Sequence, residues 1–349
     1  MPEPMARPSV GFTRASGFGP LPRLFEAAEG APALRRLLAG EGLTPGTLSP
    51  RTVIPFSSLN EVFNQASRLS GDTLFPLHVA QAMKPEDYGP YVQSALAAPT
   101  LMEAIRRLRG FAELQTNAMT FELRRNGREA FWSLHYLAAR GHKVDHHALH
   151  VLVPMVRFVT RYTGLTRKPT ALLLASAAAP FHSALETALE VPVRADAGVF
   201  SLVFPADWLA LPNPGGSKVV PTVADLLAYY RENALPRSTS DAVAAMLLPR
   251  VGEPEIDLDM IAERLAVGRR TLQQRLSAEG TSFRDIALRL RMERAKQLMA
   301  EDDSTIAQVA LAVGYSDQAH FTRAFKTATN MTPREFRRLR RPSLLMAAE

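Results

Sequence analysis

A pattern of two short helices, present twice near the C-terminal end, constrains the fold of this chain more than any other feature. Residues 261–276, IAERLAVGRRTLQQRL, and residues 309–325, VALAVGYSDQAHFTRAF, each predict an apolar helix, a short turn and a second helix with an apolar i, i+4 pair. The copies align at an offset of 48 residues, which becomes 49 after one inserted residue. This is the sequence form of a helix-turn-helix. The matched apolar positions are Ala262, Leu265, Val267, Leu272 and Leu276 in the first copy, and Ala310, Val313, Tyr315, Phe321 and Phe325 in the second.

The polar residues of each second helix are expected to face outward, because the apolar pair of that helix packs against the first helix. Arginine and glutamine have forked hydrogen-bonding groups that match the edges of guanine and adenine in the major groove of DNA. The pattern therefore predicts contact with DNA bases, and an all-helical module that binds no nucleic acid is the alternative. The candidate DNA-binding residues are Arg269, Arg270, Gln273 and Gln274 in the first copy, and Gln318, His320, Thr322 and Arg323 in the second.

The segment between the two copies, SFRDIALRLRMERAKQLM, predicts a single connecting helix. It would be about 26 Å long for 17 residues at 1.5 Å each. We expect Phe283, Ile286, Leu290 and Leu298 to be buried, and Arg284, Arg289, Arg291 and Arg294 to be exposed.

The excess positive charge of the chain lies in the same region. The formal net charge is +7, and residues 264–341 hold 16 basic and 8 acidic residues, a net charge of +8. A basic segment of this kind is expected of a domain that meets a polyanion. Solvated helix faces would give the same count, so the charge supports nucleic-acid binding without proving it.

Residues 256–341 resemble the DNA-binding domain of the AraC/XylS family of bacterial transcription regulators. The stretches that carry the resemblance are RTLQQRLSAEGTSF, RLRMERAKQLM, IAQVALAVGYSDQAHFTRAFK and NMTPREFR. The resemblance implies that the second helix of each copy enters the major groove, with Arg270, Gln273 and Gln274 as readers in the first copy and Gln318, His320 and Arg323 in the second. Two departures are Gly268, where a capping Ser is usual, and Asn330, which replaces a common Gly and tolerates a left-handed conformation.

The first two-thirds of the chain predict an α+β domain with an antiparallel sheet and helices, followed by the all-α domain with its two helix-turn-helix motifs and linker helix. Ser58 with Glu61, and Thr100 with Glu103, have the spacing of a capping box before an apolar stripe. Leu69 ends the first stripe and Phe111 the second.

Strand signals and further helices complete this prediction. MTFELRRNGREAFWSLHYLAA predicts a hairpin around Asn126-Gly127. A helix is expected over 145–163, strands in PTALLLAS and AGVFSLVFPADW, and another helix in PTVADLLAYYRENAL. The expected domains are a flexible tail at 1–20, an effector-binding and dimerisation domain at 21–235, a linker at 236–255 with a Ser-capped helix near 239–248, the DNA-binding domain at 256–341, and a tail at 342–349.

Residues from about 21 to 210 are similar to the arabinose-binding-like N-terminal domain of some AraC-type regulators. SGDTLFPLHVAQAM, YGPYVQSALAAPTLMEAIRRL and VPVRADAGVFSLVFPADWL carry this similarity. It implies a small-molecule effector, a homodimer and RNA polymerase as a partner, but names neither the ligand nor its contact residues. The alternative is a domain that mediates only dimerisation or contacts with a protein partner.

A histidine cluster in HKVDHHALH is the one chemically suggestive group in this domain. His142, His146 and His150 have i, i+4, i+8 spacing, and two His at i, i+4 can bind zinc or nickel. A solvated or hydrogen-bonded helix end is the preferred interpretation, so no metal is expected. Trp132 and His135 lie on opposite faces of a predicted strand, with Trp132 expected in the core.

Several other classes of protein are excluded or disfavoured. The chain has no cysteine, which removes disulfides, thiol nucleophiles and the cysteine-dependent repair methyltransferases that some related DNA-binding domains carry. It has none of the common catalytic or nucleotide-binding motifs, so neither enzyme activity nor a cofactor is expected. The first ten residues, MPEPMARPSV, lack the apolar core of a signal peptide, and no apolar run is long enough to span a bilayer, so we expect a cytoplasmic protein with no membrane partner.

Overall fold

The chain forms two compact units, one ending at Leu235 and the other beginning at Pro236. The computed structural model describes residues 11–49, 52–137, 144–164, 166–176, 179–215, 225–226, 235–253, 257–265, 267–301 and 304–340.

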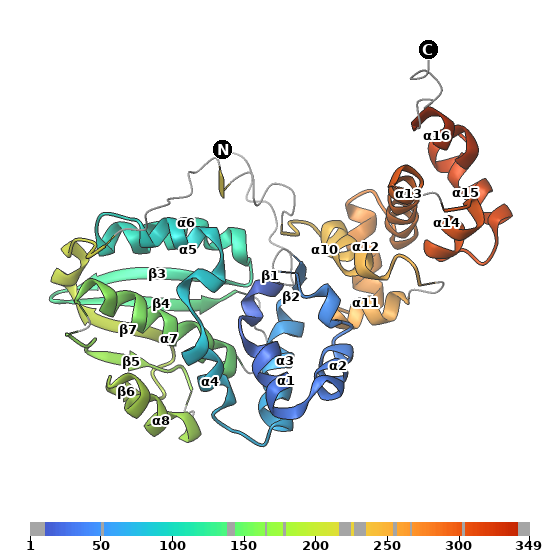
Figure 1. Cartoon of the computed structure of the whole chain (residues 1–349). Coiled ribbons are helices and arrows are strands. Elements are labelled where there is room, and N and C mark those ends of the chain that lie inside the picture. Colours follow the sequence, from blue (N-terminus) through green and yellow to red (C-terminus); the bar gives the residue numbers. More distant parts are fainter. Residues whose placement is uncertain are drawn as a thin grey trace, which may run out of the picture. The chain divides into compact units, whose positions relative to one another are not determined.

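A mixed five-stranded sheet lies at the centre of the N-terminal unit, with strand order β3-β4-β7-β5-β6 (Figure 1). Every pair is antiparallel except β5 with β6, which is parallel. Helix α8 connects these two strands, and a parallel pair requires such a crossover. The expected antiparallel sheet is thus confirmed except at this edge. The strands are β3 (Met119–Asn126), β4 (Glu129–Tyr136), β5 (Ala171–Leu173), β6 (Val193–Arg194) and β7 (Phe200–Pro205).

The hairpin of β3 and β4 forms as predicted, but its turn is one residue further along. Asn126 pairs with Glu129, so the two central turn residues are Gly127 and Arg128 rather than Asn126 and Gly127. Of these two, Gly127 has a positive φ, +58°, as the first position of a type II′ turn requires. The register places Phe121, Trp132 and Leu134 on the buried side of the sheet, and this burial overrides the local preference of the Asn-Gly pair.

Helices surround the sheet in two groups, each with its own apolar core. Helices α5 and α6 pack beside β3, and α7 lies across one face of the sheet (Figure 1). Helices α1 to α4 and strand β2 contribute buried residues to the second core. The helices are α1 (Leu21–Glu29), α2 (Ala31–Gly40), α3 (Phe56–Leu69), α4 (Phe75–Ala82), α5 (Pro90–Leu96), α6 (Leu101–Gln115), α7 (Asp145–Tyr162) and α8 (Ala179–Leu189), with 3₁₀ turns at Ala15–Phe18, Pro45–Thr47, Pro85–Tyr88 and Ala206–Ala210.

The expected tail over residues 1–20 is wrong for its second half. Strand β1 (Phe12–Arg14) pairs with β2 (Val53–Pro55), and Phe12 and Phe18 are fully buried. Two large apolar side chains stabilise this segment by burial more than its glycines destabilise it. Residues 1–10 lie outside the described residues.

The two predicted capping boxes behave differently. Thr100 caps α6, where its hydroxyl accepts a hydrogen bond from the Glu103 backbone N–H at 3.3 Å. Ser58 does not cap α3, because the helix begins at Phe56 directly after β2 and Ser58 is buried within it. Its expected partner Glu61 instead binds Arg68 at 2.7 Å.

The remaining helix predictions for this unit have mixed outcomes. Leu69 was expected on the buried stripe of α3 but is 59% exposed, because it is the last residue of the helix. Phe111 in α6 is half-buried. The expected helix over 145–163 is confirmed as α7. The one expected over 221–235 falls almost wholly outside the described residues.

The C-terminal unit is helical, as expected, but it begins before residue 256. Helix α10 is capped by Ser238, as the sequence indicated, yet it packs against α12 and α13 instead of forming a linker. Its apolar residues Val243 and Leu247 are fully buried, and the Glu279 carboxylate accepts hydrogen bonds from the Thr239 and Ser240 backbone N–H groups, both at 2.8 Å. The helices are α10 (Thr239–Leu247), α11 (Leu258–Arg264), α12 (Arg269–Ala278), α13 (Phe283–Glu301), α14 (Ile306–Ala312), α15 (Gln318–Thr329) and α16 (Pro333–Arg340).

Candidate DNA-binding interface and ligand cavity

The repeated apolar pattern forms the interior of two helix-turn-helix motifs, α11–α12 and α14–α15. Leu272 and Leu276 are buried in the first motif, and Phe321 and Phe325 in the second. The rings of Phe321 and Phe325 lie 5.6 Å apart between centroids. These pairs turn one face of α12 and of α15 inward, so the opposite faces are available to a partner.

Helix α12 presents its four candidate residues to solvent. Arg269, Arg270, Gln273 and Gln274 are all exposed. Arg269 differs from the others, because its Nη1 lies 2.6 Å from Asp259 Oδ2 in α11. Arg270, Gln273 and Gln274, at i, i+3 and i+4, form the exposed polar face of α12 among the sequence candidates.

Helix α15 presents three of its four candidates. Gln318, His320 and Arg323 are exposed, whereas Thr322 is half-buried. The Thr322 hydroxyl donates a hydrogen bond to the Gln318 carbonyl at 2.7 Å, so this side chain folds back on its own helix. The ring of His320 packs edge-on against Tyr315, with 5.2 Å between centroids.

Asp317 fixes the start of α15, and sequence reasoning did not identify this role. Its Oδ1 accepts a hydrogen bond from the His320 backbone N–H at 2.7 Å, which lowers the pKa of its carboxyl group below the ordinary value of 3.8. The signal was an Asp directly before a predicted helix, which is a preferred N-cap. Gly268 occupies the equivalent position of α12 and gives no side-chain cap.

Helix α13 connects the two motifs and lies between their helices (Figure 1). Its 19 residues span about 28 Å at 1.5 Å each. Ile286 and Leu290 are buried as expected, and Phe283 and Leu298 are half-buried. Arg284, Arg289 and Arg294 are exposed as predicted.

Arg291 was expected to be exposed but is half-buried between two parts of the unit. Its Nη2 donates a hydrogen bond to the Glu253 carbonyl at 2.8 Å, and its guanidinium carbon lies 5.6 Å from the centre of the Tyr315 ring. Gly314 lies beside this contact with φ +81°, and a Cβ there would meet the Glu253 carbonyl oxygen at 2.7 Å. The chain before α11 therefore packs tightly against the turn of the second motif.

Further basic residues lie on α15 and α16 of the same unit. Lys326 is exposed on α15, one turn after Arg323. Arg334, Arg337 and Arg338 of α16 line a surface hollow together with Thr305 and Ile306. These cations would suit phosphate groups, which supply much of the affinity in protein–DNA complexes. Their clustering in NMTPREFRRLRR was visible in the sequence only as part of the net charge.

The histidine cluster lies at the start of α7, where it forms no metal site within the described residues. His142 lies outside the described residues, and His146 is half-buried. His147 and His150 point into the interior, and His147 Nδ1 lies 2.8 Å from the Tyr136 hydroxyl. The expectation of a solvated or hydrogen-bonded helix end fits His147, which is hydrogen-bonded. It does not fit His150, which is fully buried.

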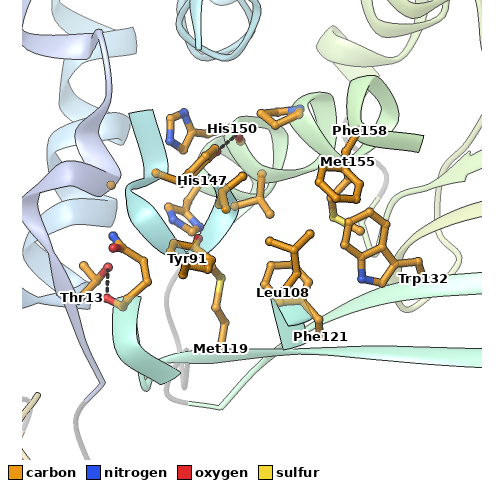
Figure 2. A pocket seen from close by; sticks show the side chains of 16 residues that line it. Thr13, Tyr91, Leu108, Met119, Phe121, Trp132, His147, His150, Met155 and Phe158 are labelled. Carbon is orange, nitrogen blue, oxygen red and sulfur yellow. Dashed lines mark hydrogen bonds between the residues drawn. The ribbon is translucent and has the colours of Figure 1, made fainter. Parts of the chain in front are cut away.

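A small cavity lies between α7, α6 and strands β3 and β4, and both buried histidines line it (Figure 2). Its wall also includes Trp132, Phe121 and Phe158. Trp132 is in the core as predicted, and it also faces this space. His135, on the other face of β4, is partly exposed and lies 3.2 Å from Glu122.

Comparison with known proteins shows which protein families the two units match. Residues 33–213 match the model of the arabinose-binding domain of AraC transcription regulators, which covers more than half of the chain, and residues 261–339 match a helix-turn-helix domain model. The chain belongs to the AraC family of transcription regulators. Both resemblances inferred from the sequence are confirmed.

Individual AraC-type relatives match over a smaller region. The transcriptional regulator VirS of Mycobacterium tuberculosis is 35% identical over 111 residues, 31% of this chain and 33% of VirS. The urease operon transcriptional activator of Escherichia coli is 35% identical over 113 residues, 32% of this chain and 38% of that protein. The matched stretch thus spans about a third of each relative.

A solved structure matches over a larger share of the chain. The transcriptional regulator CdpR from Pseudomonas aeruginosa is 21% identical, with 86% of this chain and 95% of that chain covered at a TM-score of 0.40.

The AraC-family assignment places this chain among DNA-binding transcription regulators. The helix-turn-helix model extends from within α11 to within α16. The N-terminal model includes most of the cavity wall, although Thr13 and Gly17 precede it. Among the described helices, none has the length and apolar character that a membrane span requires.

Proposed function

We propose that this AraC-family regulator contacts specific bases with both α12 and α15, and that a small molecule bound in its N-terminal unit controls this activity in the cytoplasm. The observation that carries the proposal is the pair of exposed polar faces, each opposite a buried apolar pair and both connected by α13. The net charge of +8 over residues 264–341 supports a polyanionic partner.

In this proposal Arg270, Gln273 and Gln274 contact one major groove, and Gln318, His320 and Arg323 contact the next. Successive major grooves on one face of the duplex are about 34 Å apart. A connecting helix of about 28 Å, with the offsets of the two recognition helices, matches that separation. In this proposal Arg269 stabilises the start of α12 through its ion pair with Asp259. Thr322 stabilises α15 through its hydrogen bond to the Gln318 carbonyl.

Effector control rests on the N-terminal family match and on the cavity in that unit. A homodimer and a contact with RNA polymerase complete the proposal, by analogy with the family. The alternative is that the N-terminal unit serves only assembly or a protein partner. A ligand that binds the purified full chain and changes its occupancy of DNA would exclude that alternative.

Salt titration of the full chain on a random-sequence duplex tests the DNA-binding part of the proposal. Counterion release makes log affinity fall steeply with log salt concentration, with a slope of about −0.9 for each phosphate neutralised. We expect Arg334→Gln and Arg338→Gln each to reduce that slope by about 1, while Glu26→Gln on α1 serves as an exposed control substitution. An affinity that hardly changes with salt would contradict the proposal.

A further inference from the structure

The cavity in the N-terminal unit is built from side chains that leave almost no surface to solvent. Trp132 and His150 are at most 1% exposed, and His147 is 4% exposed. The wall combines α7, α6, strands β3 and β4 and the segment after β1. The side chains that line this space are therefore mostly buried, and they come from several elements of the unit (Figure 2).

Two buried side chains of this wall carry polar atoms that lack partners. Within the part of the chain that the structure describes, neither ring nitrogen of His150 has a hydrogen-bond partner. The same holds for Nε1 of Trp132. Burial lowers the pKa of the His150 ring, and a hydrogen-bonding interaction with the Gly17 backbone opposes this effect. Buried polar groups are nearly always hydrogen-bonded in native proteins, so these atoms indicate a ligand or bound water.

Most other polar groups of the wall are already engaged. The Tyr88 hydroxyl donates to the His150 carbonyl at 2.8 Å, and the Gln115 amide donates to Ser16 at 3.0 Å. His147 pairs with Tyr136 through Nδ1. A sugar, with a hydroxyl on most of its carbons, would leave several buried hydroxyls without partners here.

The wall also lacks a charge to pair with an ionic ligand. Of the residues known to line the cavity in the described ranges, none is Asp, Glu, Lys or Arg. Burial lowers the pKa of His150 to about 4 and that of His147 well below 6.5, so both rings are neutral at pH 7. A charged group placed here would lose its hydration without gaining a counterion.

We propose that this cavity binds an uncharged, mostly apolar molecule about the size of one aromatic ring, whose single hydrogen-bonding group pairs with His150 or Trp132. The inference rests on the proposed function only for the statement that the ligand is the effector. Phe121, Phe158 and the indole of Trp132 supply aromatic faces for the ring.

The open cavity is smaller than the ligand that we propose, so its wall must move when the ligand binds. The open volume is about 60 Å³, which suits a few water molecules at about 10–15 Å³ each. Met119 and Met155 line it, and methionine side chains change rotamer easily, so the space can expand to a single ring. A larger ligand would require movement of the sheet or of α7.

The test uses the full chain with Trp208→Phe, so that Trp132 is its remaining tryptophan. Trp208 stacks on Phe204 and does not line the cavity. The probes are p-cresol, toluene, benzoate, benzylamine and L-arabinose. Binding of each probe is measured by Trp132 fluorescence and by calorimetry. We expect p-cresol to bind about tenfold more tightly than toluene, as one net hydrogen bond predicts, and benzoate, benzylamine and arabinose not to bind.

Two variants locate the binding. Val151→Phe places a ring in the cavity, so it should abolish p-cresol binding. His150→Leu keeps the space but removes the ring nitrogens, so p-cresol and toluene should bind equally if His150 is the partner. Near-ultraviolet circular dichroism of each variant establishes that the unit is folded. If Val151→Phe is misfolded, the ratio of p-cresol to toluene affinity still tests the proposal. It is compared between the wild type and His150→Leu.

The outcomes separate the two proposals. The ligand assignment is overturned if none of the neutral ring compounds binds, if benzoate, benzylamine or arabinose binds as tightly as p-cresol, or if p-cresol has no preference over toluene. If p-cresol binds as expected but leaves occupancy of DNA unchanged, the ligand class stands and effector control by such a compound fails.

Discussion

Arg291 in the middle of α13 donates a hydrogen bond of 2.8 Å to the backbone carbonyl of Glu253, which precedes the first helix-turn-helix motif. The same guanidinium group contacts the ring of Tyr315, in the turn of the second motif. One side chain thus joins the chain before the first motif to the turn of the second. We expect this contact to orient the second recognition helix relative to α13.

We expect Arg291→Met to weaken binding to a two-box DNA site by up to about 1.5–3 kcal/mol, the net value of a hydrogen bond to a charged group. Methionine keeps an apolar stem, so packing against Tyr315 is largely retained. Arg284→Met, on an exposed position of the same helix, is the control. Equal affinities of the two variants in a fluorescence-anisotropy titration would show that the Arg291 contact does not orient the motif.

Arg323→Ala should preserve folding, because Arg323 is exposed between the buried Phe321 and Phe325. Loss of a bidentate base contact should cost about 1–3 kcal/mol on a specific duplex and much less on a random one. Lys326→Ala is the comparison, with a similar loss on both duplexes if Lys326 contacts phosphate. If Arg323→Ala weakens both duplexes equally, Arg323 contacts the backbone.

The Asp317 cap should make the stability of α15 depend on pH. Because its carboxyl pKa is lowered in the folded protein, the stabilisation is complete above about pH 4 and is lost as the pH falls through the folded-state value. Asp317→Asn keeps a cap and Asp317→Ala removes it. Thermal midpoints by circular dichroism should therefore fall in the order wild type, Asn, Ala at pH 7. A wild-type advantage over Asp317→Asn that is the same at pH 3 would contradict the role of the charge.

His150 should make the N-terminal unit less stable in acid. Its folded pKa of about 4 lies below the value of 6.5 expected when unfolded, so the unfolded chain takes up the proton first. Stability is then present above about pH 6.5 and falls by about 3 kcal/mol as the pH drops to 4. Both tryptophans lie in this unit, so urea unfolding followed by their fluorescence measures it alone. His150→Leu should make the profile shallower without flattening it, because burial lowers the pKa of His147 as well. An unchanged slope would contradict the contribution of His150.

The sequence predicted the C-terminal unit well because each helix-turn-helix is specified by local spacing. The Leu272/Leu276 and Phe321/Phe325 pairs define the inward faces without knowledge of distant residues. Asn330 also adopts the expected left-handed conformation, with φ 59°, at the end of α15. Local rules sufficed where contacts are between neighbours in the chain.

The failures involve contacts between residues far apart in sequence. Ser58 and Thr100 begin the same motif, but β2 leads straight into α3 and removes the cap position from Ser58. Arg291 follows the exposed pattern of α13, and only its contacts with Glu253 and Tyr315 place it inward. The cavity joins Gly17, Trp132 and His150, and no periodic pattern relates positions so distant.

Selection of bound duplexes from a random-sequence library, with the purified full chain, tests the central claim most directly. If α12 and α15 both contact bases, the enriched sequences should contain two short, unrelated boxes whose centres are about one helical turn, 10–10.5 base pairs, apart. Arg323→Ala should relax one box and Arg270→Ala the other. Enrichment of a single box, or of no sequence at all, would contradict an account in which both helices contact DNA bases.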